Sequence, residues 1–177
     1  TKPLSYSTLW QEPDPYKEFN LVNILPDTVF NSGWKFIAGL ATERLVPDYT
    51  PQPDSLVELP HQVLLPNTAL WYEQKLTIPE AGILIIQSDD GAQLWINDKP
   101  AERIQGDVFK VSAGVHASVL VRVLNNAMAG GLKRVSYFTH SNYENLKQAY
   151  ADRLAEKRKY EREVLQLETS FPFLVGP

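Results

Sequence analysis

Short strand-like segments follow one another between residues 68 and 138, and this succession constrains the fold more than any other feature. The segments are rich in β-branched and aromatic residues, and turn residues such as Asp89-Asp90-Gly91 separate them. They cover residues 70–78, 83–87, 93–97, 107–111, 118–124 and 132–138. Strands repeated about every 8 to 12 residues, without intervening helices, are typical of an antiparallel sandwich rather than a parallel α/β sheet. The sequence therefore predicts an all-β domain.

The first 66 residues are rich in proline and hold nine of the 13 prolines in the chain. Proline lacks a backbone donor, so it breaks helices and central strands. We therefore expect extended segments that wrap around the sandwich, with short edge strands at residues 34–37 and 56–59. Trp10 and Trp34 are expected to fix this wrap to the sandwich. The predicted sandwich domain, with its wrap, covers residues 1–140.

Residues 141–168 predict one long helix. Neither proline nor glycine interrupts them, and Ser141 with Glu144 has the spacing of a capping box. An apolar stripe recurs at helical spacing between charged faces, and it comprises Tyr143, Leu146, Tyr150, Leu154, Tyr160, Val164 and Leu167. The stripe either packs on the sandwich or binds a partner. Partner binding predicts an exposed interface at Tyr143, Leu146, Tyr150 and Leu154.

The composition argues against several classes of partner and site. A net charge of −4 with a pI of about 5.4 argues against nucleic acid, because binding to a phosphate backbone needs a basic patch. The chain has no cysteine, which excludes disulfides and thiolate metal sites. No apolar run reaches the roughly 18 residues of a membrane-spanning helix, so we expect no membrane partner.

Sequence motifs for catalysis are also missing. The three histidines, His61, His116 and His140, lack the spacing of a metal site. The chain has no phosphate-binding glycine loop, nucleophile-elbow serine or dinucleotide fingerprint. A carboxylate pair of the kind that hydrolyses glycosides stays open, because Asp and Glu are plentiful and no pair is singled out. We expect a chain that is not an enzyme.

Several short motifs resemble one family. In chain order they are Leu59-Pro60-His61, Leu70-Trp71-Tyr72, Leu94-Trp95-Ile96-Asn97, Val121-Arg122-Val123-Leu124-Asn125-Asn126 and Ala129-Gly130-Gly131-Leu132. Within residues 56–135 they resemble the N-terminal sugar-binding domain of family-two glycoside hydrolases such as β-galactosidases. This resemblance implies a galactose-binding-like jelly roll, and it implies carbohydrate as a ligand.

Residues 88–99 are similar to a second family, the protective-antigen-type domain of adhesins and glycosidases. This resemblance implies that Asp89 and Asp90 hold a calcium ion that ligates sugar hydroxyls. Carboxylates are suitable ligands for calcium. The alternative is a hairpin turn of Asp and Gly that needs no ligand. Calcium is accordingly the one cofactor that the sequence suggests.

Aromatic and amide side chains near strand ends would complete a carbohydrate site. The indoles of Trp71 and Trp95 could stack on a sugar ring, although a tryptophan inside a strand more often belongs to the core. The asparagines could hydrogen-bond sugar hydroxyls or serve their own turns. The candidate carbohydrate-binding residues are Asp89, Asp90, Trp95, Asn97, Asn125 and Asn126.

Residues 171–177 resemble the opening strand of a bacterial metallophosphoesterase domain. We therefore expect residues 169–177 to begin a downstream catalytic domain. The predicted function is a non-catalytic, carbohydrate-binding-like accessory module of a secreted or periplasmic multidomain hydrolase, either a metallophosphoesterase or a glycosidase. The alternative is a structural spacer that docks a catalytic domain through the helix and has no ligand of its own.

Overall fold

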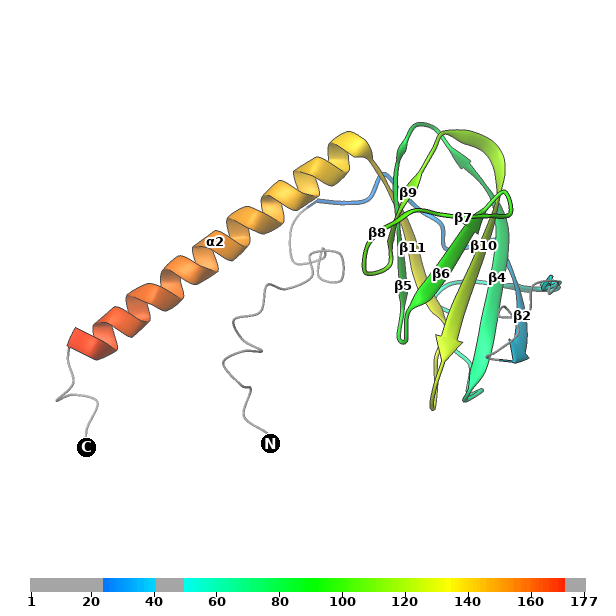
Figure 1. Cartoon of the computed structure of the whole chain (residues 1–177), viewed down its shortest axis with the longest axis horizontal. Coiled ribbons are helices and arrows are strands. Elements are labelled where there is room, and N and C mark those ends of the chain that lie inside the picture. The colour runs from blue at the N-terminus through cyan, green and yellow to red at the C-terminus, as the bar shows by residue number, and fades with distance from the viewer. Residues whose placement is uncertain (1–23, 41–49, 171–177) are drawn as a thin grey trace.

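The computed structural model describes residues 24–40 and 50–170, which form a β-sandwich followed by a long helix (Figure 1). One sheet has five strands in the order β1-β11-β5-β9-β8, and the other has six in the order β3-β2-β4-β10-β6-β7. All the strand pairs are antiparallel. The strands are β1 (Thr28–Val29), β2 (Trp34–Leu40), β3 (Ser55–Val57), β4 (Thr68–Ile78), β5 (Gly82–Ser88), β6 (Ala92–Ile96), β7 (Lys99–Pro100), β8 (Arg103–Gln105), β9 (Val108–Val111), β10 (Gly114–Asn125) and β11 (Leu132–Thr139). The predicted antiparallel sandwich with a C-terminal helix is confirmed.

The main core lies between the two sheets, and strand alternation decides which side chains enter it. The six-stranded sheet contributes alternate residues of its two central strands, which are Leu70, Tyr72, Leu76 and Ile78 of β4 and Val119, Val121 and Val123 of β10. The five-stranded sheet supplies the opposite wall, including Leu84, Ile86, Val135 and Tyr137. Each buried aliphatic or aromatic side chain contributes about 1.5–3 kcal/mol, so a one-residue slip of register would be costly.

The proline-rich part of the chain supplies strands near both predicted positions, but only β3 lies at the edge of the six-stranded sheet. β2 has a neighbour on each side, so the expectation of an edge strand at residues 34–37 is wrong. β2 pairs with β4, and β3 pairs with β2 at the edge of the six-stranded sheet. Trp34 is buried in the core, and its indole N–H donates to the carbonyl of Phe30 at 2.8 Å. Trp10 and the expected opening of a downstream domain at residues 171–177 lie outside the described residues.

Two short strands, β7 and β8, were not predicted. Lys99–Pro100 pairs with the end of β6. Asn97 and Asp98 both have positive φ, at 50° and 65°, as the two central residues of a type I′ hairpin require. The tight turn therefore returns the chain into the same sheet.

The helix α2 (His140–Ser170) begins directly after β11, one residue before its predicted start. The hydroxyl of Thr139 accepts a hydrogen bond from the backbone N–H of Asn142 at 3.2 Å. Thr139 is therefore the N-cap, and the expected cap at Ser141 is wrong. The carboxylate of Asp27 also accepts from the backbone N–H of Thr139 at 2.8 Å. We refer to residues 139–146 as the helix base.

The helix base packs on the outer face of the five-stranded sheet. Tyr143 and Leu146 join a second apolar cluster with the sheet residues Ile83, Ile85, Val108 and Phe138. This cluster forms because β5 is apolar on both faces, so its outer face also needs a cover. Beyond the base, α2 extends away from the sandwich (Figure 1).

The apolar stripe of α2 is not the exposed interface that partner binding predicted. Tyr143, Leu146 and Tyr150 have exposed fractions of 4%, 0% and 6%, and Leu154 is half-buried. That expectation is wrong for the first three residues, because two of them cover the outer face of the sandwich. Within the described residues, no helix has the length and apolar character needed to cross a membrane.

Candidate functional site

The six predicted carbohydrate-binding residues do not form one site. Asp89, Asp90, Asn125 and Asn126 lie at one end of β6 and β10. Asn97 lies at the opposite end of β6, beyond five strand residues that each add about 3.3 Å. Trp95 lies between the two ends. The structure therefore brings together the two aspartates and two of the asparagines, and it separates them from Asn97.

One carboxylate oxygen of each of the two aspartates is engaged within the loop cluster. Asp89 forms an ion pair with Lys133 at the start of β11. Asp90 accepts a hydrogen bond from the backbone N–H of Asn126 at 3.0 Å. Both contacts join the β5–β6 turn to the chain that follows β10. They stabilise the turn.

Asn125 is enclosed by the surrounding loops and is not open to solvent. Its side chain is fully buried, and its amide donates to the carbonyls of Leu65 and Met128 at 2.9 and 3.0 Å. A Cβ at Gly130 would lie 2.5 Å from the Asn125 amide oxygen, so any side chain there would displace the Asn125 amide. The amide thus closes the loop between β10 and β11.

The calcium prediction has two carboxylates to draw on in this loop. Across residues 24–40 and 50–170, no group of three His, Cys, Asp or Glu side chains comes together as a metal site. Calcium usually takes six to eight oxygen ligands, so Asp89 and Asp90 would need backbone carbonyls or water as further ligands. Calcium binding stays a prediction.

Asn97 serves the hairpin between β6 and β7. Its side-chain oxygen accepts from the backbone N–H of Ser118 at 2.9 Å, and its own N–H donates to the carbonyl of Ser118 at 2.8 Å. These two bonds tie the turn to β10. The turn chemistry that was one of the two interpretations of Asn97 is present.

Trp95 and Trp71 lie on the outer face of the six-stranded sheet. Leu70 and Tyr72 enter the core, so alternation places Trp71 on the opposite face. The two indole rings are 5.8 Å apart between centroids, with Trp71 fully buried and Trp95 half-buried. Neither indole belongs to the core between the sheets.

Polar groups accompany this aromatic pair. The guanidinium of Arg122 lies 5.7 Å from the ring of Trp71 and donates to the side-chain oxygen of Gln93 at 2.8 Å. Arg122 itself is buried.

The motifs of the family-two resemblance meet at a second polar group, which the site prediction missed. The phenol of Tyr72 lies 2.7 Å from Nδ1 of His61 and accepts from the backbone N–H of Leu132 at 3.3 Å. The backbone N–H of His61 donates to the carbonyl of Leu132 at 2.9 Å. A Cβ on Gly131 would lie 2.1 Å from the carbonyl oxygen of His61. The three motifs thus form one packed contact.

Burial sets the protonation of this group. It raises the pKa of Tyr72 to about 12 and lowers the pKa of His61. The phenol and the imidazole are therefore both neutral near pH 7. Across the 2.7 Å contact, either the phenol donates its proton to Nδ1 or Nδ1–H donates to the phenol, depending on the tautomer of His61. The ring of Phe36 lies 4.7 Å from His61 and 5.1 Å from Tyr72. The three rings therefore pack against one another, with Tyr72 buried and His61 half-buried.

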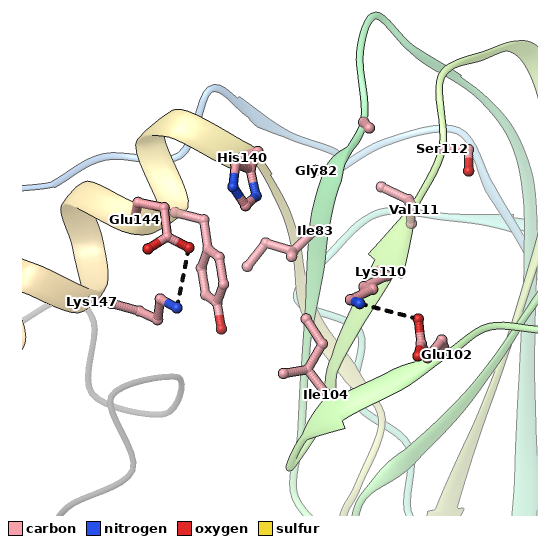
Figure 2. A pocket seen from close by; sticks show the side chains of 12 residues that line it. Gly82, Ile83, Glu102, Ile104, Lys110, Val111, Ser112, His140, Glu144 and Lys147 are labelled. Carbon is pink, nitrogen blue, oxygen red and sulfur yellow. Dashed lines mark ion pairs between the residues drawn. The ribbon is translucent and has the colours of Figure 1, made fainter.

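A cleft of about 720 Å³ lies between the helix base and the five-stranded sheet (Figure 2). Tyr143 and the isoleucines Ile83 and Ile104 contribute its apolar walls, and two ion pairs lie at its edges. Lys110 pairs with Glu102 at 3.4 Å, and Lys147 pairs with Glu144 at 3.1 Å. The charged groups of the cleft are thus balanced within it.

We compared the chain with known protein families and with curated proteins, and neither comparison gave a match.

Proposed function

We propose that this chain is a non-catalytic accessory module that holds a neighbouring catalytic domain of the same polypeptide at a set position through α2. The helix base carries this function, because it joins the helix to the sandwich by packing and by hydrogen bonds. Leu146 is fully buried in the outer cluster, and Thr139 caps the helix. A helix fixed at one end and extended beyond it is suited to act as a spacer.

The parent protein in this proposal is a secreted or periplasmic hydrolase, either a metallophosphoesterase or a glycosidase, as the resemblances imply. The polar side chains of the loops at this end of β6 and β10 support a module without catalysis, because they bond to other groups of the chain. Asp90 and Asn125 use polar atoms for bonds that close loops. The carboxylate of Asp89 is neutralised by Lys133.

A galactose-binding-like jelly roll is the topology that we propose for the sandwich. Its strands cross repeatedly between the two sheets: β4 lies in the six-stranded sheet, β5 in the five-stranded sheet and β6 again in the six-stranded sheet. β9, β10 and β11 alternate in the same way. Such crossings are typical of Greek-key sandwiches and jelly rolls.

Distance measurements between spin labels test the spacer function. The chain has no cysteine, so Lys75→Cys on β4 and Gln166→Cys on α2 would carry two labels without background. We expect one narrow distance distribution. Leu146→Ala should broaden it, because the buried contact of the helix base is lost. A broad distribution in the chain without the Leu146 change would refute a spacer of fixed geometry.

Carbohydrate binding is a second candidate function, and the half-buried indole of Trp95 favours it. The Trp95 ring lies beside that of Trp71, and the Arg122 guanidinium near the Trp71 ring binds Gln93. This face of the sheet thus combines a stacking surface with hydrogen-bonding groups. Calorimetry with galactosides, xylans and pectic sugars, with and without calcium, tests this function. We expect Trp95→Ala to abolish binding and Tyr160→Ala to leave it unchanged. Absence of binding to every sugar would reject the candidate.

A further inference from the structure

The distal part of α2 carries apolar side chains that the sandwich does not cover. Tyr160, Val164 and Leu167 have exposed fractions of 67%, 39% and 63%. Their spacing of i, i+4 and i+7 puts them on one side of the helix over roughly 10 Å. We name these three residues the distal stripe. Single exposed apolar residues are ordinary, whereas a row on one helix face indicates a contact surface.

Glutamates border the distal stripe on both sides. When the stripe takes the a and d positions of a heptad, Glu156 and Glu163 take g positions and Glu161 takes an e position. Residues at e and g lie beside the apolar seam and face the partner helix. Arg158 and Arg162 lie on the opposite side of α2, at b and f. Along the distal stripe, the contact surface is therefore apolar at its centre and acidic at its edges.

This charge pattern disfavours a second copy of the chain as the occupant. In a parallel pair of α2 helices, Glu156 at g would face Glu161 at e of the partner. In an antiparallel pair, the g positions face each other, so Glu156 would meet Glu163. Like charges at such positions are destabilising in both orientations. A basic partner reverses the sign of each contact.

Building on the proposed spacer function, we infer that the distal stripe docks an amphipathic helix of the neighbouring domain whose apolar seam is edged by lysine or arginine. Lys157 adds a selective element, because it takes the a position one heptad before Val164. A lysine at an a position specifies the register and oligomeric state of a helix pair at a cost in stability. The stripe thus selects its partner by charge as well as by apolar contact.

A comparison of peptide binding to the full chain tests this inference. The probe is a synthetic three-heptad peptide with Ile at a, Leu at d and Lys at e and g. Its matched control has Glu at e and g, and a second control has the lysine sequence in shuffled order. We expect the lysine peptide to bind at least about tenfold more tightly than either control in fluorescence anisotropy. The preference should weaken at high salt.

Charge reversal supplies the decisive variant. E156K/E161K/E163K should reverse the preference in favour of the glutamate peptide, whereas R158E/R162E on the opposite side should keep the original preference. Equal binding of both peptides, an unchanged preference in the triple variant or self-association of the chain in sedimentation would overturn the inference. A narrow spin-label distribution together with any of these results would refute the docking surface while leaving the spacer function intact.

Discussion

Asp27 and Asn142 lie 115 residues apart in the sequence, and the side-chain amide of Asn142 donates to the carboxylate of Asp27 at 3.1 Å. The same carboxylate oxygen accepts from the backbone N–H of Thr139 at 2.8 Å. The amide of Asn142 also donates to the carbonyl of Leu25 at 2.8 Å. The segment before β1 is thereby joined to the first turn of α2.

Replacing Asp27 should loosen this junction. We expect Asp27→Ala to lower the free energy of unfolding by about 1–2 kcal/mol, because two donors at the helix base lose their acceptor. Urea denaturation measures the change. Asp152→Ala is the control, since that carboxylate accepts an exposed bond from Gln148 and should change stability by less than about 0.5 kcal/mol. Equal effects of the two changes would contradict a special role for Asp27.

The two ends of α2 should respond differently to loss of a leucine. Leu146→Ala should cost about 2–5 kcal/mol, because it opens a cavity in the outer cluster. Leu167→Ala removes a side chain that is 63% exposed and should cost less than about 0.5 kcal/mol. Urea denaturation of both variants provides the comparison. A similar loss at Leu167 would mean that the distal stripe is already covered in the isolated chain.

Gly131 should tolerate no side chain. A methyl group there would lie 2.1 Å from the carbonyl oxygen of His61, and φ is +149°. We expect Gly131→Ala to cost about 3 kcal/mol through backbone displacement and strain. Gly91 also has positive φ, but a methyl group there would meet no atom within 4 Å, so Gly91→Ala should cost only about 1 kcal/mol. Thermal unfolding of both variants would show the order, and the reverse order would be inconsistent with these contacts.

Replacing Asn125 should destabilise the fold, whereas replacing Asn126 should not. Asn125→Ala leaves the carbonyls of Leu65 and Met128 without their buried donor, so we expect a loss of about 1–3 kcal/mol in urea denaturation. Asn126 contributes its backbone N–H to Asp90, which Asn126→Ala retains, so that variant should match the unmodified chain. If Asn125→Ala kept full stability and abolished sugar binding, the structural role assigned to it would be wrong.

Tyr72 should make the fold sensitive to alkali. Burial raises its pKa from 10.0 in the unfolded chain to about 12 in the folded protein, so the folded state holds the phenolic proton more tightly. This stabilisation is complete below pH 10 and is lost as the pH rises from 10 through 12. Tyr72→Phe abolishes this component and costs about 1–2 kcal/mol at neutral pH, because His61 and Leu132 lose their partner. In urea denaturation, the difference in free energy of unfolding between the unmodified chain and Tyr72→Phe should narrow above pH 10. A difference independent of pH would contradict the raised pKa.

The central strands could be predicted because their apolar residues repeat with turn residues between them. β8 could not, since Arg103–Gln105 is exposed throughout and has no apolar pattern to mark it. β7 follows an Asn-Asp turn without glycine, so the sequence carries only a weak hairpin signal. The helix was predictable from its length and spacing. Its cap was not, because Ser141 with Glu144 matches a capping box, whereas Thr139 has Asn142 at the corresponding position.

The candidate site was harder to predict, because its residues depend on contacts that are distant in the sequence. Alternation alone indicates that Trp71 and Leu70 take opposite faces, but it does not show that the outer face of the sheet is also buried. Asn125 resembles an exposed turn residue until the chain near Leu65 and Met128 folds over it. The motifs around His61 and Tyr72 were recognised as separate segments, and only the fold joins them.

The unbroken passage from β11 into α2 also has a mechanical consequence. A pulling force on the helix would enter the sandwich through β11, which is bonded to β1 on one side and to β5 on the other. Along the β5 side the ladder runs from Leu132 to Thr139, so its bonds would share the load instead of opening one at a time. Tension between two tethered domains would therefore act on β11, which is hydrogen-bonded to a neighbouring strand on each side.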